Sequence, residues 1–160
     1  MDWQLLPGWR GGDDELMPAL SGLYDWDAAG RATGWLLLQD RPPATAWPQP
    51  LAEAGPALLA ALLGATGIRF TAVCFQAYLN GAGTGWHTDA EWDAQAILSL
   101  GVTRTFGIRR TGGGGETYLR LAHGDLLVMP PGFQDGREHS VPAEDARGAR
   151  CSLVFRSSSP

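Results

Sequence analysis

The residues best suited to chemistry are two histidines and an aspartate. His87 and Asp89 stand two positions apart in a segment that we expect to be extended. Strand side chains alternate between faces, so this spacing directs both toward one side, about 6.6 Å apart along the strand. A second histidine from elsewhere would complete a facial metal site with open coordination positions, and we assign His139 to it.

The alternative third ligand is His123. It stands in Ala122-His123-Gly124-Asp125, a turn-like stretch before an apolar segment, where a histidine is more often a surface residue. A His-x-Asp pair also occurs often by chance, so the metal site needs support from other residues.

That support comes from the C-terminal segment. Arg150, Ser152 and Arg156 are separated by even numbers and therefore share one face of the expected strand. Two guanidinium groups on one face match a dicarboxylate, because each can bind one carboxylate through two hydrogen bonds. Gln76 and Tyr78 also share a face and would add an amide and a phenol hydroxyl. The alternative is a pair of ordinary surface arginines on an edge strand.

The elements that must position these residues are short and mostly extended. Beyond residue 67, β-like runs alternate with turn residues and no helical pattern separates them, which is typical of an antiparallel sandwich or jelly roll. We expect strands over 70–78, 96–100, 105–109, 117–121, 125–129 and 151–156, with short extended segments around His87 and His139. With a supporting helix over 51–63, the predicted fold is mainly β (α+β).

The N-terminal part has a different character. Residues 1–45 mix Gly, Pro, Trp and Asp without sustained periodicity, apart from a short strand expected over 34–39. We expect this part to form a lid over a catalytic core at residues 46–160. The length of 160 residues and the 44% hydrophobic content suit a single domain, 1–160.

Charge bears on the choice of partner. All twelve basic residues are arginine, and seventeen Asp and Glu bring the formal net charge to -5. A polyphosphate gains affinity when Lys and Arg neutralise it, so this balance disfavours extended duplex binding. A basic strip formed by Arg104, Arg109, Arg110 and Arg120 would still allow a nucleic acid to bind.

Other features concern the compartment. No run approaches the roughly 18 apolar residues of a membrane span, and the first residues lack the basic start of a secretory signal. Cys74 and Cys151, each flanked by apolar residues, are expected to be buried thiols rather than a disulfide. We therefore expect a soluble, cytoplasmic protein without a membrane partner, and a monomer.

Taken in order, the motifs resemble the core of the AlkB family of dioxygenases over roughly residues 46–156. The matching segments are Tyr78-Leu79-Asn80-Gly81, Trp86-His87-Thr88-Asp89-Ala90-Glu91, Leu98-Ser99-Leu100-Gly101, Arg104-Thr105-Phe106, His123-Gly124-Asp125, His139-Ser140-Val141-Pro142 and the Arg-x₅-Arg from Arg150 to Arg156, with Trp47-Pro48 and Thr66-Gly67 upstream. The resemblance implies a double-stranded β-helix with Fe(II) on His87, Asp89 and His139, and O₂ as a co-substrate.

The same resemblance implies 2-oxoglutarate as the second co-substrate. Arg150 and Tyr78 would hold its distal carboxylate, while Arg156 and Gln76 would lie near its metal-binding end. Gln76 stands where the family usually has Asn, and Ser152 where some members have Asn, but both keep a polar group.

The substrate implied by the resemblance is an N-alkylated base in single-stranded or flipped DNA or RNA, which is oxidatively demethylated. Glu91 matches an acidic residue near the base in such members, and Trp26 is our choice for the stacking residue of the lid. The alternatives are a solvated carboxylate and a packing tryptophan. Rival functions are oxidation of a small molecule or protein side chain, which the acidic, lysine-free composition favours, and a non-catalytic module that binds metal and 2-oxoglutarate.

Overall fold

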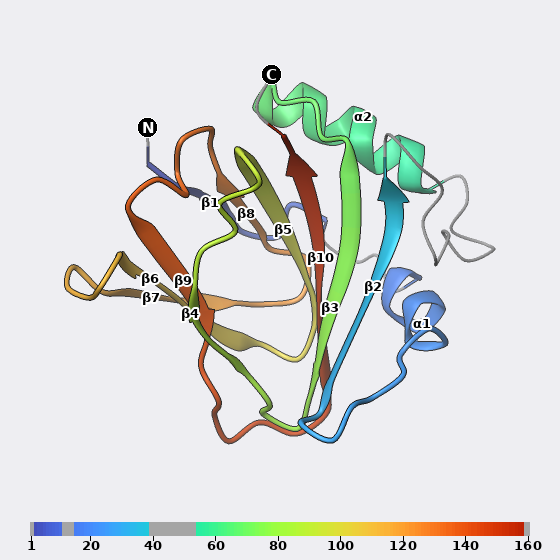
Figure 1. The fold of residues 1–160 in the computed structure, drawn as a ribbon. Coiled ribbons are helices and arrows are strands. Elements are labelled where there is room, and N and C mark those ends of the chain that lie inside the picture. Colours follow the sequence, from blue (N-terminus) through green and yellow to red (C-terminus); the bar gives the residue numbers. More distant parts are fainter. Residues whose placement is uncertain (1, 11–14, 39–53, 159–160) are drawn as a thin grey trace.

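The computed structural model describes residues 2–10, 15–38 and 54–158 (Figure 1). Its helices are α1 (Leu16–Ser21) and α2 (Ala54–Thr66). Its strands are β1 (Gln4–Leu6), β2 (Arg31–Leu38), β3 (Ala72–Leu79), β4 (Thr84–His87), β5 (Ala94–Gly101), β6 (Arg104–Arg110), β7 (Thr117–Leu121), β8 (Leu126–Met129), β9 (Arg137–Val141) and β10 (Ala149–Ser157).

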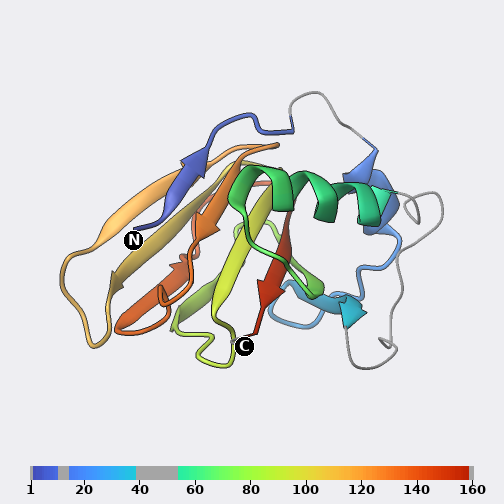
Figure 2. The same ribbon diagram turned by 90° about the horizontal axis from the view of Figure 1, so that it is seen from above.

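The strands form two antiparallel sheets that face one another. The larger sheet has the order β1-β8-β5-β10-β3-β2 and the smaller has the order β4-β9-β6-β7. Figures 1 and 2 show the two layers, with α2 lying across the larger sheet. This arrangement confirms the predicted mainly β jelly-roll fold.

Alternation along the strands divides the core into two clusters. On β10, Leu153 and Phe155 face the helices, together with Leu58 and Leu62 of α2. Val154 faces the smaller sheet instead. Because adjacent strand residues point to opposite faces, β10 is buried on both sides, and its polar side chains on the inner face are enclosed between the sheets.

The predicted strands are present, with ends shifted by a few residues. The strand expected over 70–78 is Ala72–Leu79, and that expected over 117–121 is Thr117–Leu121. The helix expected over 51–63 is Ala54–Thr66, and residues 51–53 of that prediction lie outside the described residues, as do Trp47-Pro48 and the last residue of the strand expected over 34–39.

The region expected to form a lid contributes strands to the larger sheet. β1 pairs with β8, and β2 pairs with β3. Ala32 and Leu36 of β2 are buried in the core on the helix side. β2 covers the edge of β3 that β10 leaves unpaired, and its buried apolar residues favour this pairing. The chain division expected near residue 45 therefore does not separate the described strands from the sheet.

Two predictions about the chain as a whole can be compared with the structure. Cys74 and Cys151 are both free and buried, as expected for structural thiols. Within the described ranges, neither helix has the length and apolar character that a membrane span requires.

Candidate active site

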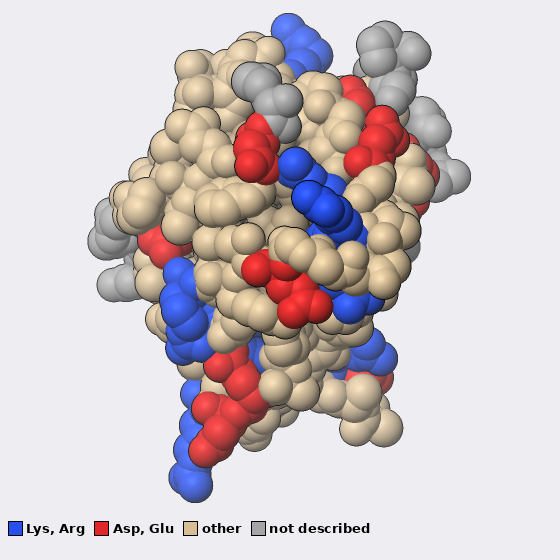
Figure 3. Space-filling model, turned by 90° about the vertical axis from the view of Figure 1, so that its left-hand side faces the viewer, with Lys and Arg blue, Asp and Glu red and all other residues tan. Residues whose placement is uncertain are grey.

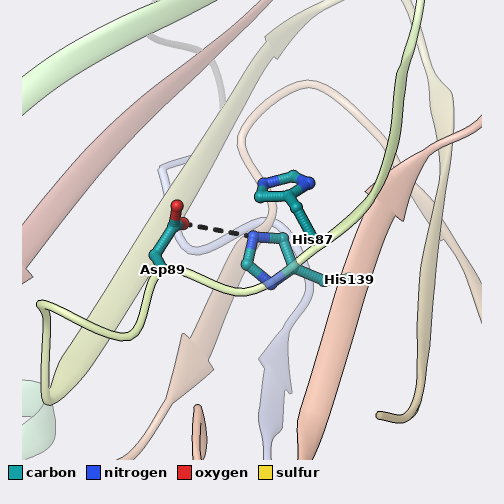
Figure 4. A group of neighbouring side chains, drawn as sticks. All are labelled: His87, Asp89 and His139. Atoms are coloured by element: carbon teal, nitrogen blue, oxygen red, sulfur yellow. Dashed lines mark ion pairs between the residues drawn. The ribbon is translucent and has the colours of Figure 1, made fainter. Parts of the chain in front are cut away.

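His87, Asp89 and His139 converge between the two sheets (Figure 4). One ligand atom from each lies within 4.8 Å of the others. His139 Nε2 is 3.3 Å from Asp89 Oδ2, and the two imidazole centroids are 4.3 Å apart. Two imidazoles and one carboxylate fit a divalent transition metal, and three protein ligands leave coordination positions open.

Different contacts position each of the three side chains. His87 is the last residue of β4 and pairs with His139 of β9. Its Nδ1 is 2.7 Å from the carbonyl oxygen of Gly85. With a proton on Nδ1, the ring donates this bond and leaves Nε2 as the free donor atom for a metal. Phe106 stacks on the His139 ring at 5.6 Å. Both imidazoles are therefore fixed before any ion binds.

Asp89 is oriented by hydrogen bonds and not by strand alternation, which the sequence had suggested. β4 ends at His87, so Asp89 lies in the following loop and strand alternation does not orient it. Instead, Gln95 Nε2 donates to Asp89 Oδ2 at 2.9 Å, and the amide of Asp89 donates to Gln134 Oε1 at 3.2 Å. The convergence was predicted, but the reason given for it was wrong for Asp89.

The protonation states suit metal ligands. Burial opposes ionisation of Asp89, but hydrogen bonds from His139 and Gln95 outweigh it and hold the pKa of this carboxyl well below its ordinary value. Burial lowers the pKa of His139, which favours the neutral imidazole. A carboxylate and a neutral imidazole are the forms that coordinate a metal.

Arg150 is 1% exposed and is oriented for an anion that the protein itself does not supply. Its Nε donates to Ser99 Oγ at 3.3 Å, but among the described residues neither Nη1 nor Nη2 has a hydrogen-bond partner. Tyr78 lies beside it, with the ring centroid 5.7 Å from Cζ and the hydroxyl 3.5 Å from Gln76 Oε1. A buried guanidinium without an anion is costly, so this arrangement fits a carboxylate ligand.

Arg156 lies next to the triad. Its Nη2 is 3.6 Å from Asp89 Oδ2, and its Nε is buried without a partner in the part of the chain that the structure describes. Its guanidinium also lies 5.6 Å and 5.7 Å from the ring centroids of Trp35 and Trp92. Because β10 lies between β5 and β3, neither Arg150 nor Arg156 is on an edge strand, and the surface alternative is excluded.

Apart from Arg150, the predicted metal and co-substrate residues line one small cavity between the sheets. Its lining contains the triad together with Gln76, Tyr78, Ser152 and Arg156. Tyr78 is next to Arg150, so a metal ion on the triad and an anion that reached Tyr78 and Arg150 would be neighbours, as a chelating dicarboxylate requires.

A larger cavity of about 460 Å³ opens beside His87. Asp25, Asp27 and Arg31 are the aspartates and the arginine that line it in the described part of the chain. Arg31 Nη1 donates to Thr84 Oγ1 at 3.4 Å, and its Nε is 3.9 Å from Asp27 Oδ2. These residues could not be predicted from the sequence, because they lie in a stretch without periodicity.

The structure does not bring the two predicted substrate residues together. Glu91 is exposed in the turn after Asp89. Trp26 packs 5.2 Å from Tyr24 and against the core on the helix side of the larger sheet, away from the face that carries the triad. This contact matches the packing alternative for Trp26.

Other aromatic and amide residues near the site were missed. Trp35 and Trp92 lie 5.9 Å apart beside Arg156. Gln95 and Gln134 hold Asp89. The sequence signal available for Gln95 was its place as a polar residue in a mostly apolar strand.

His123 and the expected basic strip have structural roles. His123 Nδ1 accepts the Gly101 amide at 2.9 Å, in the turn before β8. Arg104 is 1% exposed and pairs with Glu144 at 3.0 Å, because its strand turns it inward. Arg109 pairs with Glu138 at 2.8 Å. The four arginines of the expected strip therefore do not form the continuous basic surface that would have favoured a nucleic acid, and Figure 3 shows acidic and basic side chains interspersed on this side.

The sequence matches the 2OG-Fe(II) oxygenase superfamily over residues 15–156, and the chain belongs to this superfamily. It is therefore an enzyme, a dioxygenase that uses Fe(II), 2-oxoglutarate and O₂. When bound, the iron and 2-oxoglutarate supply the oxidising power for O₂-dependent attack on a C–H bond.

Solved structures of similar fold cover nearly all of the chain. An oxidoreductase of the 2OG-Fe(II) oxygenase family from Burkholderia pseudomallei has a TM-score of 0.65 at 17% identity, with 98% of this chain and 85% of that chain covered. OsALKBH1 has 0.68 at 16%, with 98% of each chain covered. A Pseudomonas putida prolyl-4-hydroxylase has 0.63 at 18%, with 99% and 94% covered. No curated protein matches the sequence.

Proposed function

We propose that this oxygenase oxidises a C–H bond of a small polar molecule or of a protein side chain. In this proposal His87, Asp89 and His139 hold the iron. Their two imidazoles and one carboxylate lie within 4.8 Å of one another, which supports this assignment.

Arg150 and Tyr78 bind the distal carboxylate of 2-oxoglutarate, and Arg156 and Gln76 lie near its other end, with Ser152 as a polar wall. The unpartnered Nη1 and Nη2 of Arg150 support this role, since a carboxylate would satisfy both through a bidentate contact. The buried aromatic and aliphatic side chains around the cavity exclude water from the reacting groups.

The choice of substrate class rests on one observation, the charge at the entrance. Two carboxylates, Asp25 and Asp27, line the cavity beside His87, and among the described residues Arg31 is the one arginine in this lining, 3.9 Å from Asp27. A phosphate chain entering here would meet a net negative rim. A neutral, cationic or zwitterionic molecule would not be repelled.

The surface arginines support the same choice. Arg109, Arg120 and Arg137 each pair with a carboxylate, at 2.8 Å, 2.7 Å and 2.6 Å. Affinity for nucleic acid comes largely from cations that replace the counterions of phosphate. Arginines already neutralised by acidic partners contribute little of this affinity.

Oxidative demethylation of N-alkylated bases in single-stranded DNA or RNA is the second candidate, with AlkB-like family membership. The order of motifs from Tyr78 to Arg156 favours it. The indoles of Trp35 and Trp92, close to the Arg156 guanidinium beside the triad, add aromatic surface of the kind that flat bases contact.

N-methylated substrates without phosphates and with increasing numbers of phosphates separate the two candidates. N-methylated amino acids, 1-methyladenosine, and the same base in a short and a long single strand would be compared at several salt concentrations. Succinate and formaldehyde would be measured. We expect turnover that does not rise with strand length and depends weakly on salt. A specificity constant that rises with strand length and falls steeply with salt would contradict the proposal and support the second candidate.

A further inference from the structure

A third cavity, the outer cavity, has a volume of about 440 Å³ and lies on the outer face of the smaller sheet, beside β4. Trp86 and Tyr118 form one wall, with ring centroids 6.2 Å apart and planes inclined at 58°. Tyr118 is 54% exposed, although it is a large apolar side chain on a strand. The exposed ring offers a stacking surface that the fold itself does not use.

The floor of this cavity contains an unused hydroxyl. Ser140 is 3% exposed and lines the cavity, and no described residue forms a hydrogen bond with its Oγ. Ser140 follows His139 on β9, so the two side chains point to opposite faces of the sheet. A buried hydroxyl without a partner costs free energy unless a ligand or water satisfies it.

Gly107 on the neighbouring strand keeps this floor open. A Cβ there would lie 2.7 Å from Trp86 Cη2, 2.9 Å from Ser140 Oγ and 3.2 Å from Tyr118 Cε1. The absence of a side chain at this position therefore allows the two rings and the hydroxyl to converge.

The outer cavity and the larger cavity beside His87 lie on either side of β4, and Thr84 of this strand lines both. β4 is the terminal strand of its sheet, so a ligand that occupied both cavities would cross it at the sheet edge. A Cβ built at Gly85 meets nothing within 4 Å, so no side chain stands above this part of the strand.

Within the part of the chain that the structure describes, the lining of the outer cavity is uncharged. It consists of Gly83, Thr84, Gly85, Trp86, Tyr118, Ser140, Pro142 and Ala143. Arg109, which lies 4.3 Å over the Trp86 ring, is already paired with Glu138. The site thus suits a neutral group with a ring and a hydrogen-bond acceptor, and it offers no cation for a phosphate.

From these features we infer that the outer cavity binds the residue next to the oxidised one in an extended peptide substrate. A ring-bearing residue, such as proline, packs against Tyr118 and Trp86, and its backbone carbonyl accepts a hydrogen bond from Ser140 Oγ. The inference rests on the proposed function, in the form in which the oxidised group belongs to a peptide.

Binding at the outer cavity can be measured without turnover. The probes are N-acetylprolinamide and uridine 5′-monophosphate, followed by the NMR signal of the Trp86 indole, which Trp86→Phe identifies. We expect the amide to shift this signal, with Ser140→Ala weakening its binding about fivefold through the lost hydrogen bond. The matched control is Thr117→Ala, since Thr117 is on the same strand as Tyr118 but lines a different cavity. Binding of neither probe, or stronger and salt-sensitive binding of the nucleotide, would overturn the inference.

A separate experiment tests whether one peptide occupies both the outer cavity and the cavity beside His87. Succinate formation would be followed with a library of N-acetylated, C-amidated tripeptides and with single capped amino acids. Tyr118→Ala should lower the specificity constant for tripeptides by about tenfold, roughly the value of one ring contact, and leave single capped residues unaffected. If single residues and tripeptides react equally well and Tyr118→Ala changes neither, this inference fails while the proposed function stands. If neither class stimulates succinate formation, both fail.

Discussion

Two arginines of this protein, Arg104 and Arg150, are equally buried, with 1% of each exposed. Their guanidinium groups lie 5.9 Å and 5.7 Å from the ring centroid of the same residue, Tyr78. Arg104 donates hydrogen bonds to Glu144 and to the carbonyls of Gly81, Ala82 and Pro142.

Arg150 has one hydrogen bond, at 3.3 Å to Ser99, and two guanidinium nitrogens without a partner among the described residues. Burial alone therefore does not distinguish a structural arginine from a ligand-binding one. The hydrogen-bond donors that lack a partner distinguish the two arginines. Four substitutions test this distinction.

Replacement of Arg150 by Met should have the largest effect, on ligand affinity. We expect the dissociation constant of 2-oxoglutarate to rise about a hundredfold or more, because a buried charged contact is lost. The melting temperature should stay the same or rise, because an unpaired buried cation is removed. Anaerobic calorimetry with iron present measures the affinity, and Arg110→Met, at an exposed position, is the control. Unchanged affinity in Arg150→Met would remove the distinction between the two arginines.

The corresponding substitution Arg104→Met should act on stability. The bonds of Arg104 tie the segment before β4 to the segment after β9, the strands that carry His87 and His139. We expect the free energy of unfolding to fall by about 2 kcal/mol, and the melting temperature by roughly 4–8 °C. Urea titration measures this loss. A fully stable Arg104→Met protein with lost 2-oxoglutarate binding would show that the two roles had been exchanged.

Glu144, the partner of Arg104, gives a pH dependence. Burial opposes its ionisation, but hydrogen bonds from Thr105, Arg120 and Arg104 lower the pKa of Glu144 from 4.5 to about 2. A carboxyl whose pKa is lowered by folding stabilises the fold above its unfolded pKa, and this contribution is lost as pH falls from 4.5 toward 2. Glu144→Gln should cost about 1 kcal/mol at neutral pH, and the difference from wild type should shrink over that range. Urea titrations at neutral and acidic pH test this, and a constant difference would contradict it.

The smallest effect is expected at the partly exposed pair Arg109–Glu138. It joins β6 to β9 like the Arg104 cluster, but its side chains are 22% and 18% exposed. Glu138→Gln should change the free energy of unfolding by less than about 1 kcal/mol and leave 2-oxoglutarate affinity unaltered. A loss as large as that of Arg104→Met would mean that ion pairing, rather than satisfaction of buried donors, separates the arginines.

The part of the site that could be predicted from the sequence is the part that local periodicity determines. Arg150, Ser152 and Arg156 share a face because strand side chains repeat every two residues, and the structure places them so. The family motifs added His139, which meets His87 across a strand pair that a single sequence does not reveal.

The remainder depends on contacts between distant segments. Arg104 was considered for a surface strip, but it is buried and pairs with Glu144, forty residues further along the chain. The sequence around Arg104 does not reveal this distant partner. The positions of the entrance residues Asp25 and Arg31 could not be predicted from the sequence. Arg31 begins β2, and the place of β2 in the sheet depends on its pairing with β3 rather than on hydrophobic periodicity within β2. Strand order and burial of charged groups follow from such long-range pairing, which periodicity cannot indicate.

The central claim is that iron on His87, Asp89 and His139 acts together with 2-oxoglutarate between the two sheets. The decisive measurement is succinate formed after O₂ is added to protein loaded anaerobically with Fe(II) and 2-oxoglutarate, for the wild type and for His87→Ala. We predict iron-dependent succinate formation in the wild type and its loss in His87→Ala, with the fold retained by circular dichroism. Succinate formed at the wild-type rate by His87→Ala would contradict the account.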